Sequence, residues 1–98
     1  MTLGELGLTA LGGREARVSG LALDSREVRP GALFAALPGH SAHGAAHARA
    51  AVAAGAVAVL TDPEGLRLMG EVDAALVVAE DARQTFARAA ALWFGPVP

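Results

Sequence analysis

The chain of 98 residues contains no cysteine, lysine, isoleucine, tyrosine or asparagine, and its aromatic residues are one tryptophan and three phenylalanines. Without cysteine, this stretch can form no disulfide, no thiolate metal site and no cysteine nucleophile. Without lysine, it can form neither a phosphate-binding P-loop nor a Schiff base, because both need the lysine amine. All eight basic residues are therefore arginine.

Long apolar runs and a strong charge of one sign are also missing. Arg, Asp, Glu, His or Pro interrupts every apolar stretch well before the ~18–20 residues of a membrane span. No positive charge precedes the first apolar residues and no cleavage pattern follows them, so we expect no signal peptide and a cytoplasmic location. The formal net charge of −2 disfavours a nucleic-acid-binding module, which usually presents a basic face.

The composition that is present predicts one small folded domain. Hydrophobic residues make up 53% of the chain and charged residues 18%, which is too apolar for a disordered segment. A chain of this length buries roughly 65% of its unfolded surface, enough for one core without disulfides or metals. Alanine supplies 24 residues, a bias typical of coding in GC-rich bacteria.

Hydrophobic periodicity predicts strands that alternate with helices. Strands are expected at 18–23, 33–37, 57–60 and 74–79. Helices are expected at 3–11, 45–54 and 63–70, and a final helix is expected after Asp81. The alternation predicts an α/β fold with a small, mainly parallel or mixed sheet of about four to five strands flanked by helices.

Local signals support these boundaries. The sequence Arg29-Pro30-Gly31 fits a type II turn, because Pro sets φ and Gly accepts a positive φ. Asp62 followed by Pro63 is typical of a helix start, and Asp81 with Gln84 three residues later resembles a capping box. Gly55 is expected to end the alanine-rich helix.

The last helix is expected to carry a common apolar face, made by Phe86, Ala89, Ala90, Trp93 and Phe94. Trp93 and Phe94 are interpreted as core or interdomain packing. Residues 95–98 have the sequence Gly-Pro-Val-Pro, which breaks both helix and strand and reads as a linker. We therefore expect a domain at 1–94 and, at 95–98, the start of a linker to a further domain.

Two polar loops follow the first two predicted strands, at residues 24–26 and 38–44. In open α/β sheets, ligands bind beyond the carboxyl ends of the strands. The second loop also opens a helix, whose backbone N–H groups and dipole suit a phosphate. Ser25 and Ser41 add hydroxyl groups that suit a ribose or the edge of a nucleobase.

Both loops can also be interpreted without a ligand. Residues 24–26 fit an ordinary turn in which Asp24 bonds nearby backbone and Arg26 is solvated, and residues 40–44 fit a simple connection. His43 and His47 are four residues apart, which on a helix would place them on one face. With no cysteine and no carboxylate close in sequence, solvated histidines are favoured over a metal site. Solvated positions are also expected for Arg67, Arg83 and Arg88.

A set of motifs between Leu21 and Leu60 resembles the N-terminal domain of the Mur ligases, the enzymes that build the peptide stem of bacterial peptidoglycan. The motifs are the Asp24-Ser25-Arg26 turn, the Pro30-Gly31 turn, the strand Leu33–Leu37 with Gly39, and the strand Gly55–Leu60. The lead before Asp24 and the Leu37-Pro38-Gly39 segment are most similar to the Mur ligase E type. The Mur ligase F type, which adds D-alanyl-D-alanine, is the alternative within the family, and a free-standing α/β interaction module is the alternative outside it.

The resemblance implies that this domain binds the UDP part of UDP-N-acetylmuramoyl-L-alanyl-D-glutamate. The parent enzyme would be an ATP-dependent ligase that adds a diamino acid, with meso-diaminopimelate favoured by the GC-rich composition, by forming an amide bond. ATP and magnesium would be held by a central domain and the incoming amino acid by a C-terminal domain. The fragment itself would hold no cofactor or metal, contain no catalytic residue and be inactive alone.

The resemblance also assigns individual positions. Leu23 and Ser25 fall on positions that contact the uridine, and the loop that contacts the UDP group corresponds to His40, Ser41 and Ala42. Two residues depart from the family pattern: His43 stands where Asp is usual, and His47 stands where an aromatic residue is frequent. A histidine has no carboxylate oxygen to accept a hydrogen bond, so the sequence leaves open whether the following helix keeps its usual cap.

Overall fold

The computed structural model describes residues 1–39 and 43–95. Its centre is a sheet of four strands in chain order, β1 (Gly20–Ala22), β2 (Ala32–Ala36), β3 (Ala58–Thr61) and β4 (Ala75–Val78). Each strand pairs with the next in parallel orientation. The predicted α/β class is thus confirmed, with a sheet that is parallel throughout.

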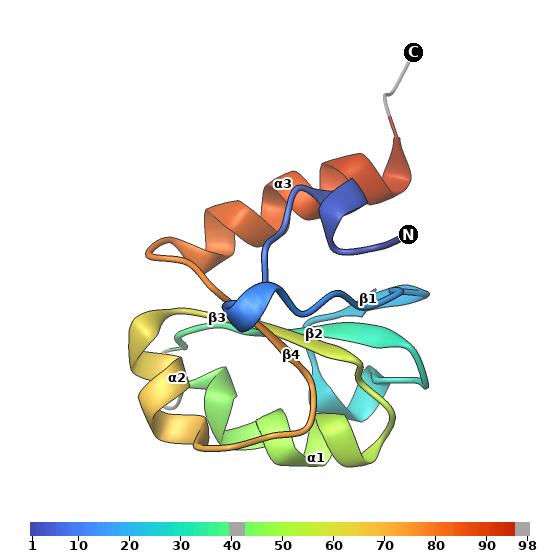
Figure 1. The fold of residues 1–98 in the computed structure, drawn as a ribbon. Coiled ribbons are helices and arrows are strands. Elements are labelled where there is room, and N and C mark those ends of the chain that lie inside the picture. The colour runs from blue at the N-terminus through green and yellow to red at the C-terminus, as the bar shows by residue number, and fades with distance from the viewer. Residues whose placement is uncertain (40–42, 96–98) are drawn as a thin grey trace.

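Helices cover both faces of this sheet (Figure 1). On one face lie α1 (Ala48–Ala53) and α2 (Pro63–Met69), and on the other lie α3 (Ala82–Phe94) and the N-terminal segment. Short 3₁₀ turns at Gly4–Leu6, Leu11–Gly13, Ser25–Glu27 and Gly44–His47 connect or precede these elements. The result is a three-layer α/β/α arrangement, as expected for parallel strands whose connections carry helices.

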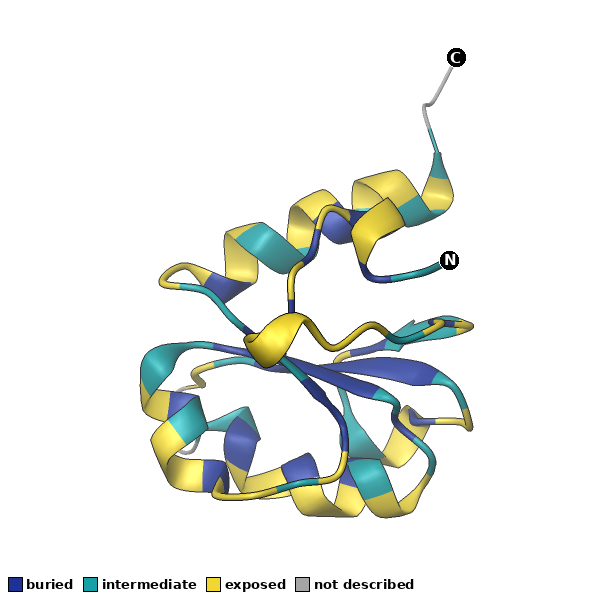
Figure 2. Ribbon diagram, viewed as in Figure 1, coloured by how far each residue is buried: buried dark blue, intermediate teal, exposed yellow. Residues whose placement is uncertain are grey.

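The apolar core is divided into two halves by the sheet. Phe34 and Val59 pack among the residues of the α1 and α2 side, whereas Leu33 and Leu60 pack with α3 and the N-terminal leucines. Successive side chains of a strand point to opposite faces, and Figure 2 shows buried residues along the strands, between the two helical layers. This explains why the predicted strands read as continuous apolar runs instead of alternating ones.

The local signals read from the sequence are confirmed. Ala32 N–H donates to the Arg29 carbonyl over 3.0 Å, and Gly31 has a φ of 91°, as a type II turn requires. Asp62 accepts a hydrogen bond from Gly65 N–H at the start of α2. Asp81 accepts one from Gln84 N–H at the start of α3. Each carboxylate satisfies a backbone donor that the helix leaves without a partner.

The predicted helix at 3–11 is wrong. Only Gly4–Leu6 forms a 3₁₀ turn, and Gly7 ends it in the left-handed region with a φ of 75°. Leu3, Leu6 and Leu8 are nevertheless buried, and the Glu15 carboxylate accepts a hydrogen bond of 2.7 Å from Leu3 N–H. Packing against the sheet and α3 therefore holds this glycine-containing segment without a regular helix. The helix expected at 45–54 likewise opens as the 3₁₀ turn Gly44–His47, before α1 begins at Ala48.

The apolar face of α3 includes four of the five expected residues. Ala89 is completely buried and Phe86 and Trp93 pack partly buried against the same core, and Ala90 is half-buried. Phe94 is 79% exposed, so it is not part of this core, and its interpretation as interdomain packing stays a prediction. Five residues beyond Ala89, its side chain is rotated by about 140° from the buried face.

No helix within 1–39 or 43–95 combines the length and apolar character that crossing a membrane would require.

Candidate functional site

A cleft of about 450 Å³ lies where β1 and β2 end, at the same edge of the sheet. It brings together the turn after β1, one strand residue and the turn that precedes α1. The lining residues are Leu23, Asp24, Ser25, Arg26, Phe34, Gly44 and His47. Because β1 and β2 are parallel neighbours, two loops that are distant in sequence form opposite walls of one cleft.

The first wall is a turn stabilised by its own side chains. Asp24 Oδ1 accepts a hydrogen bond of 2.9 Å from Arg26 N–H, the backbone bond that the plain turn interpretation expects. The Arg26 guanidinium also donates to both carboxylate oxygens, with Nε–Oδ1 at 3.1 Å and Nη2–Oδ2 at 2.7 Å. These bonds lower the pKa of Asp24 to about 2. Arg26 is therefore paired with an ionised carboxylate at the rim of the cleft.

The second wall needs a glycine where the chain turns into the helix. Gly44 N–H donates to the Leu37 carbonyl over 2.8 Å. A Cβ atom at position 44 would lie 2.9 Å from the Leu37 nitrogen and 3.1 Å from the Ala36 Cα. Real side chains essentially never approach backbone this closely, so the contact between this turn and the end of β2 requires the absence of a side chain.

The cap of this turn is formed by the histidine that stands in place of the usual aspartate. His43 Nδ1 accepts a hydrogen bond of 2.9 Å from Ala45 N–H. The cap that the sequence left open is therefore formed, because an unprotonated imidazole nitrogen is a hydrogen-bond acceptor like a carboxylate oxygen. The other ring nitrogen, Nε2, lies 2.8 Å from Asp62 Oδ1.

Asp62 joins this arrangement to α2. Burial raises the pKa of Asp62, but hydrogen bonds from Gly65 N–H and His43 outweigh that effect and leave the pKa below its ordinary value. Asp62 is thus held as a carboxylate that accepts from both groups.

The backbone donors at the start of the turn are engaged within the protein. Gly44 N–H donates to Leu37, Ala45 N–H to the His43 ring, and Ala46 N–H to the His43 carbonyl over 3.1 Å. These three groups therefore do not form the phosphate cradle expected from a helix start. The predicted contacts of His40, Ser41 and Ala42 lie outside the described residues and stay predictions.

The two described histidines face different surroundings. His43 contacts Asp62, whereas His47 is exposed and lines the cleft. Within the described parts of the chain, no three His, Cys, Asp or Glu side chains gather closely enough to hold a metal ion. Arg67, Arg83 and Arg88 are exposed, as expected, and Arg83 also donates from Nη2 to the Pro38 carbonyl over 2.9 Å.

Of the sequence-predicted residues that the structure describes, Leu23 and Ser25 both line the cleft. Phe34 was missed as a site residue because its strand position predicts only core, and it is indeed 1% exposed. Asp24 and Arg26 were recognised as a turn, and His47 only as a departure from the family pattern. These residues come together because the strand register places Ala22 beside Phe34 in neighbouring parallel strands.

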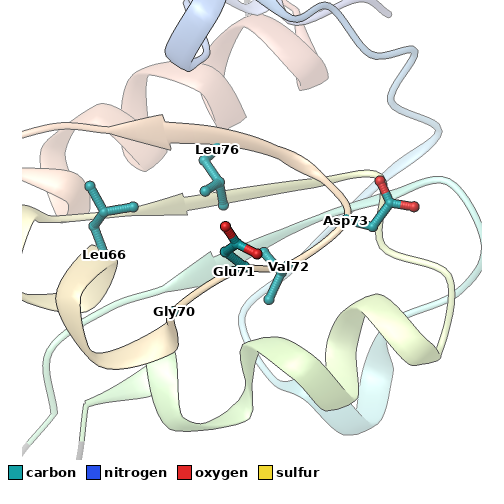
Figure 3. A pocket seen from close by; sticks show the side chains of 6 residues that line it. All are labelled: Leu66, Gly70, Glu71, Val72, Asp73 and Leu76. Carbon is teal, nitrogen blue, oxygen red and sulfur yellow. The ribbon is translucent and has the colours of Figure 1, made fainter.

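A second hollow, of about 520 Å³, lies at the opposite edge of the sheet. Figure 3 shows its lining, which consists of Leu66, Gly70, Glu71, Val72, Asp73 and Leu76. It follows α2 and leads into β4, at the amino ends of the strands. Glu71 and Asp73 make this hollow negative, which disfavours a phosphate. Its place at the amino ends of the strands also differs from the carboxyl ends, where ligands of parallel sheets usually bind.

Comparison with known proteins shows a consistent set of relatives. The sequence profile of the Mur ligase family, catalytic domain, matches residues 17–93. A UDP-N-acetylmuramoyl-L-alanyl-D-glutamate–2,6-diaminopimelate ligase of Streptomyces avermitilis is 45% identical over 82 residues, covering 84% of this chain and 16% of that protein. The ligase of the same name from Streptomyces coelicolor is 42% identical over 91 residues, covering 93% and 18%. The chain thus spans less than a fifth of the length of these relatives.

Solved structures with the same fold include two MurF proteins. MurF from Acinetobacter baumannii superposes with a TM-score of 0.69 at 19% identity, covering 92% of this chain and 19% of that one. MurF from Thermotoga maritima, in complex with ADP, superposes with a TM-score of 0.60 at 26% identity, covering 74% and 16%. At these identities the likeness to MurF concerns chiefly the fold.

Proposed function

The chain belongs to the Mur ligase family, and on this basis we propose that its cleft binds the UDP part of UDP-N-acetylmuramoyl-L-alanyl-D-glutamate. The observation that carries this proposal is the convergence of Leu23 and Ser25 with Gly44 and His47 at the carboxyl ends of β1 and β2. Residues 1–94 would form the substrate-binding N-terminal domain, and residues 95–98 would lead toward an ATP-binding domain.

The chemistry of the lining suits a nucleotide. Leu23, 58% exposed, offers an apolar surface to the face of a uracil ring. The Ser25 hydroxyl both donates and accepts, as the edge of uracil or a ribose hydroxyl requires. Arg26 and His47 are the basic side chains of the lining. Arg26 is paired with Asp24 but is 87% exposed, so its remaining N–H donors and His47 mark the side of the cleft that a diphosphate would favour.

The activity proposed for the parent enzyme is ATP-dependent formation of an amide bond between the substrate and a diamino acid, with meso-diaminopimelate favoured. The names and the 42–45% identity of the two Streptomyces relatives support the diamino acid over D-alanyl-D-alanine. The donor set of this chain does not fit ATP with magnesium. It has no lysine, and no cluster of three metal-ligating side chains occurs among the described residues. Those groups would be bound by other parts of the parent protein, together with the incoming amino acid, in the cytoplasm where we expect the enzyme to act.

Calorimetric titration of UDP and of UDP-N-acetylmuramoyl-L-alanyl-D-glutamate into the 98-residue chain tests the proposal. We expect both to bind at one site, and Leu23→Asp to abolish or strongly weaken binding by placing a carboxylate against the base and diphosphate. Leu68→Asp is a matched control, because Leu68 is also 58% exposed but lies in α2, outside the cleft. Equal binding by the two variants, or no binding by the unmodified chain, would contradict the proposal.

A further inference from the structure

We propose that His43 is a positioning residue, which holds the second wall of the cleft in place as a neutral imidazole hydrogen-bonded to Asp62. The inference rests on the proposed function, because its consequence is measured on nucleotide binding. His43 does not line the cleft, whereas Gly44 and His47 do. It would therefore act on the ligand through the turn Gly44–His47 and not by contact.

The hydrogen bonds assign the protonation state of the ring. Ala45 N–H points at His43 Nδ1 over 2.9 Å, so Nδ1 must present a lone pair and carry no proton. The proton of a neutral imidazole then sits on Nε2, which lies 2.8 Å from Asp62 Oδ1 and donates to it. The side chains of His43 and Asp62 are only 7% and 17% exposed, so water competes little for either bond.

Asp62 is itself fixed, which makes it an effective anchor. Its Oδ1 atom accepts from Gly65 N–H over 2.7 Å at the first turn of α2. The preceding residue, Thr61, donates from Oγ1 to the Ala36 carbonyl over 2.9 Å in the buried interior. The ends of β2 and β3 are thereby joined, and the His43–Asp62 bond joins the turns that follow them.

The space for the His43 ring is made by a glycine on α2. A Cβ atom at position 65 would lie 2.7 Å from His43 Cε1 and would overlap Thr61 Oγ1. Gly65 is buried, so a side chain there could not turn away into solvent. The His43 ring thus contacts an acceptor on Asp62 through Nε2 and a donor on Ala45 through Nδ1. Its Cε1 atom occupies space that a side chain at position 65 would fill.

Three variants of the 98-residue chain separate the two bonds of His43. His43→Ala removes both bonds. In His43→Asn, a short side-chain oxygen can still cap Ala45 N–H but does not extend as far as Asp62. Asp62→Asn keeps an acceptor oxygen for both Gly65 N–H and the Nε2–H of His43 while removing the charge. Glu64→Gln, an exposed carboxylate in the same helical turn, is the control for the last change.

Calorimetric affinity for UDP is the main measurement, with thermal unfolding to show that each variant is folded. We expect His43→Ala to weaken UDP binding about tenfold, as for the loss of one to two hydrogen bonds. His43→Asn should recover only part of that loss, and Asp62→Asn and Glu64→Gln should stay within about twofold of the unmodified chain. Long-range ¹H–¹⁵N correlation spectra should show His43 as the Nε2–H tautomer at neutral pH.

The outcomes distinguish this inference from the proposed function. If the unmodified chain fails to bind UDP, the proposed function is wrong. If it binds, and folded His43→Ala or His43→Asn binds equally well, His43 does not position the wall. If Asp62→Asn binds UDP as weakly as His43→Ala, or if the spectra show a doubly protonated ring, the His43–Asp62 contact is an ion pair and the proposed neutral hydrogen bond is wrong. Should His43→Ala not fold, the other two variants and the spectra still decide.

Discussion

Leu23, just beyond the end of β1, and Gly44, at the start of the turn before α1, line the same cleft. They lie close together because β1 and β2 are parallel neighbours with Ala22 opposite Phe34. The segments that follow the two strands therefore leave the sheet at the same edge. The relationship depends on the sheet and not on any contact between the two side chains. Changes in either loop are therefore expected to affect ligand binding separately.

Replacing Ser25 by alanine should weaken UDP binding several-fold. The change removes one hydroxyl from the cleft wall, and one hydrogen bond contributes about 0.5–1.5 kcal/mol. In the parent ligase the same change should raise KM for the UDP substrate and leave kcat nearly unchanged, because the uridine end is remote from the new amide bond.

Ser19→Ala is the control for this change, because Ser19 donates to the Pro30 carbonyl and does not line the cleft. A large loss of kcat in Ser25→Ala with an unchanged KM would place Ser25 in the chemical step.

Gly44→Ala should destabilise the fold and weaken UDP binding together. The added Cβ would lie 2.9 Å from the Leu37 nitrogen, and relief of such overpacking costs about 1–3 kcal/mol. Gly20→Ala is the control, because a Cβ atom at Gly20 meets nothing within 4 Å. Chemical denaturation of both variants measures the difference, and equal stabilities would show that the turn can move away from β2 freely.

Replacing Arg26 by alanine should raise the pKa of Asp24 from about 2 toward its ordinary value of 3.8. A lowered pKa in the folded state contributes stability above the unfolded pKa, and this contribution is lost as the pH falls through the folded pKa. The unmodified chain should therefore lose this contribution between about pH 4 and pH 2, and Arg26→Ala should lose less there. NMR titration of the Asp24 carboxyl carbon measures the pKa directly. An unchanged pKa in Arg26→Ala would assign the shift to the backbone bond alone.

The 98-residue chain should hydrolyse no ATP and catalyse no ligation. A phosphate-binding loop of the P-loop type needs a lysine, and the sequence contains none. A coupled assay of ADP release, with and without the UDP substrate, checks this on purified chain. Turnover above the background of a mock purification would require a nucleotide site that the arginines and histidines of this domain supply.

The sequence by itself determined the α/β class, the approximate positions of the four strands and the family, whereas it left open a mixed sheet and a fifth strand. Strand and helix patterns, the Arg29-Pro30-Gly31 turn and the Asp62 and Asp81 caps are local, because they depend on residues within a few positions of one another. Leu23 and Ser25 were assigned through the family resemblance, which the same locality makes possible because both belong to one motif that follows a strand; their contact with a ligand stays a prediction.

Tertiary structure decided the remaining features, because they depend on what lies next to a residue in space. The N-terminal leucines are buried against the sheet without forming the predicted helix, and Phe94 at the end of α3 is exposed. His43 caps its turn because Asp62 and the gap at Gly65, on a different element, orient its ring. The N–H groups of Gly44, Ala45 and Ala46 donate hydrogen bonds to Leu37 and His43. No pattern in the sequence predicts such pairings, because the packing of strands and helices determines which residues distant in the chain become neighbours.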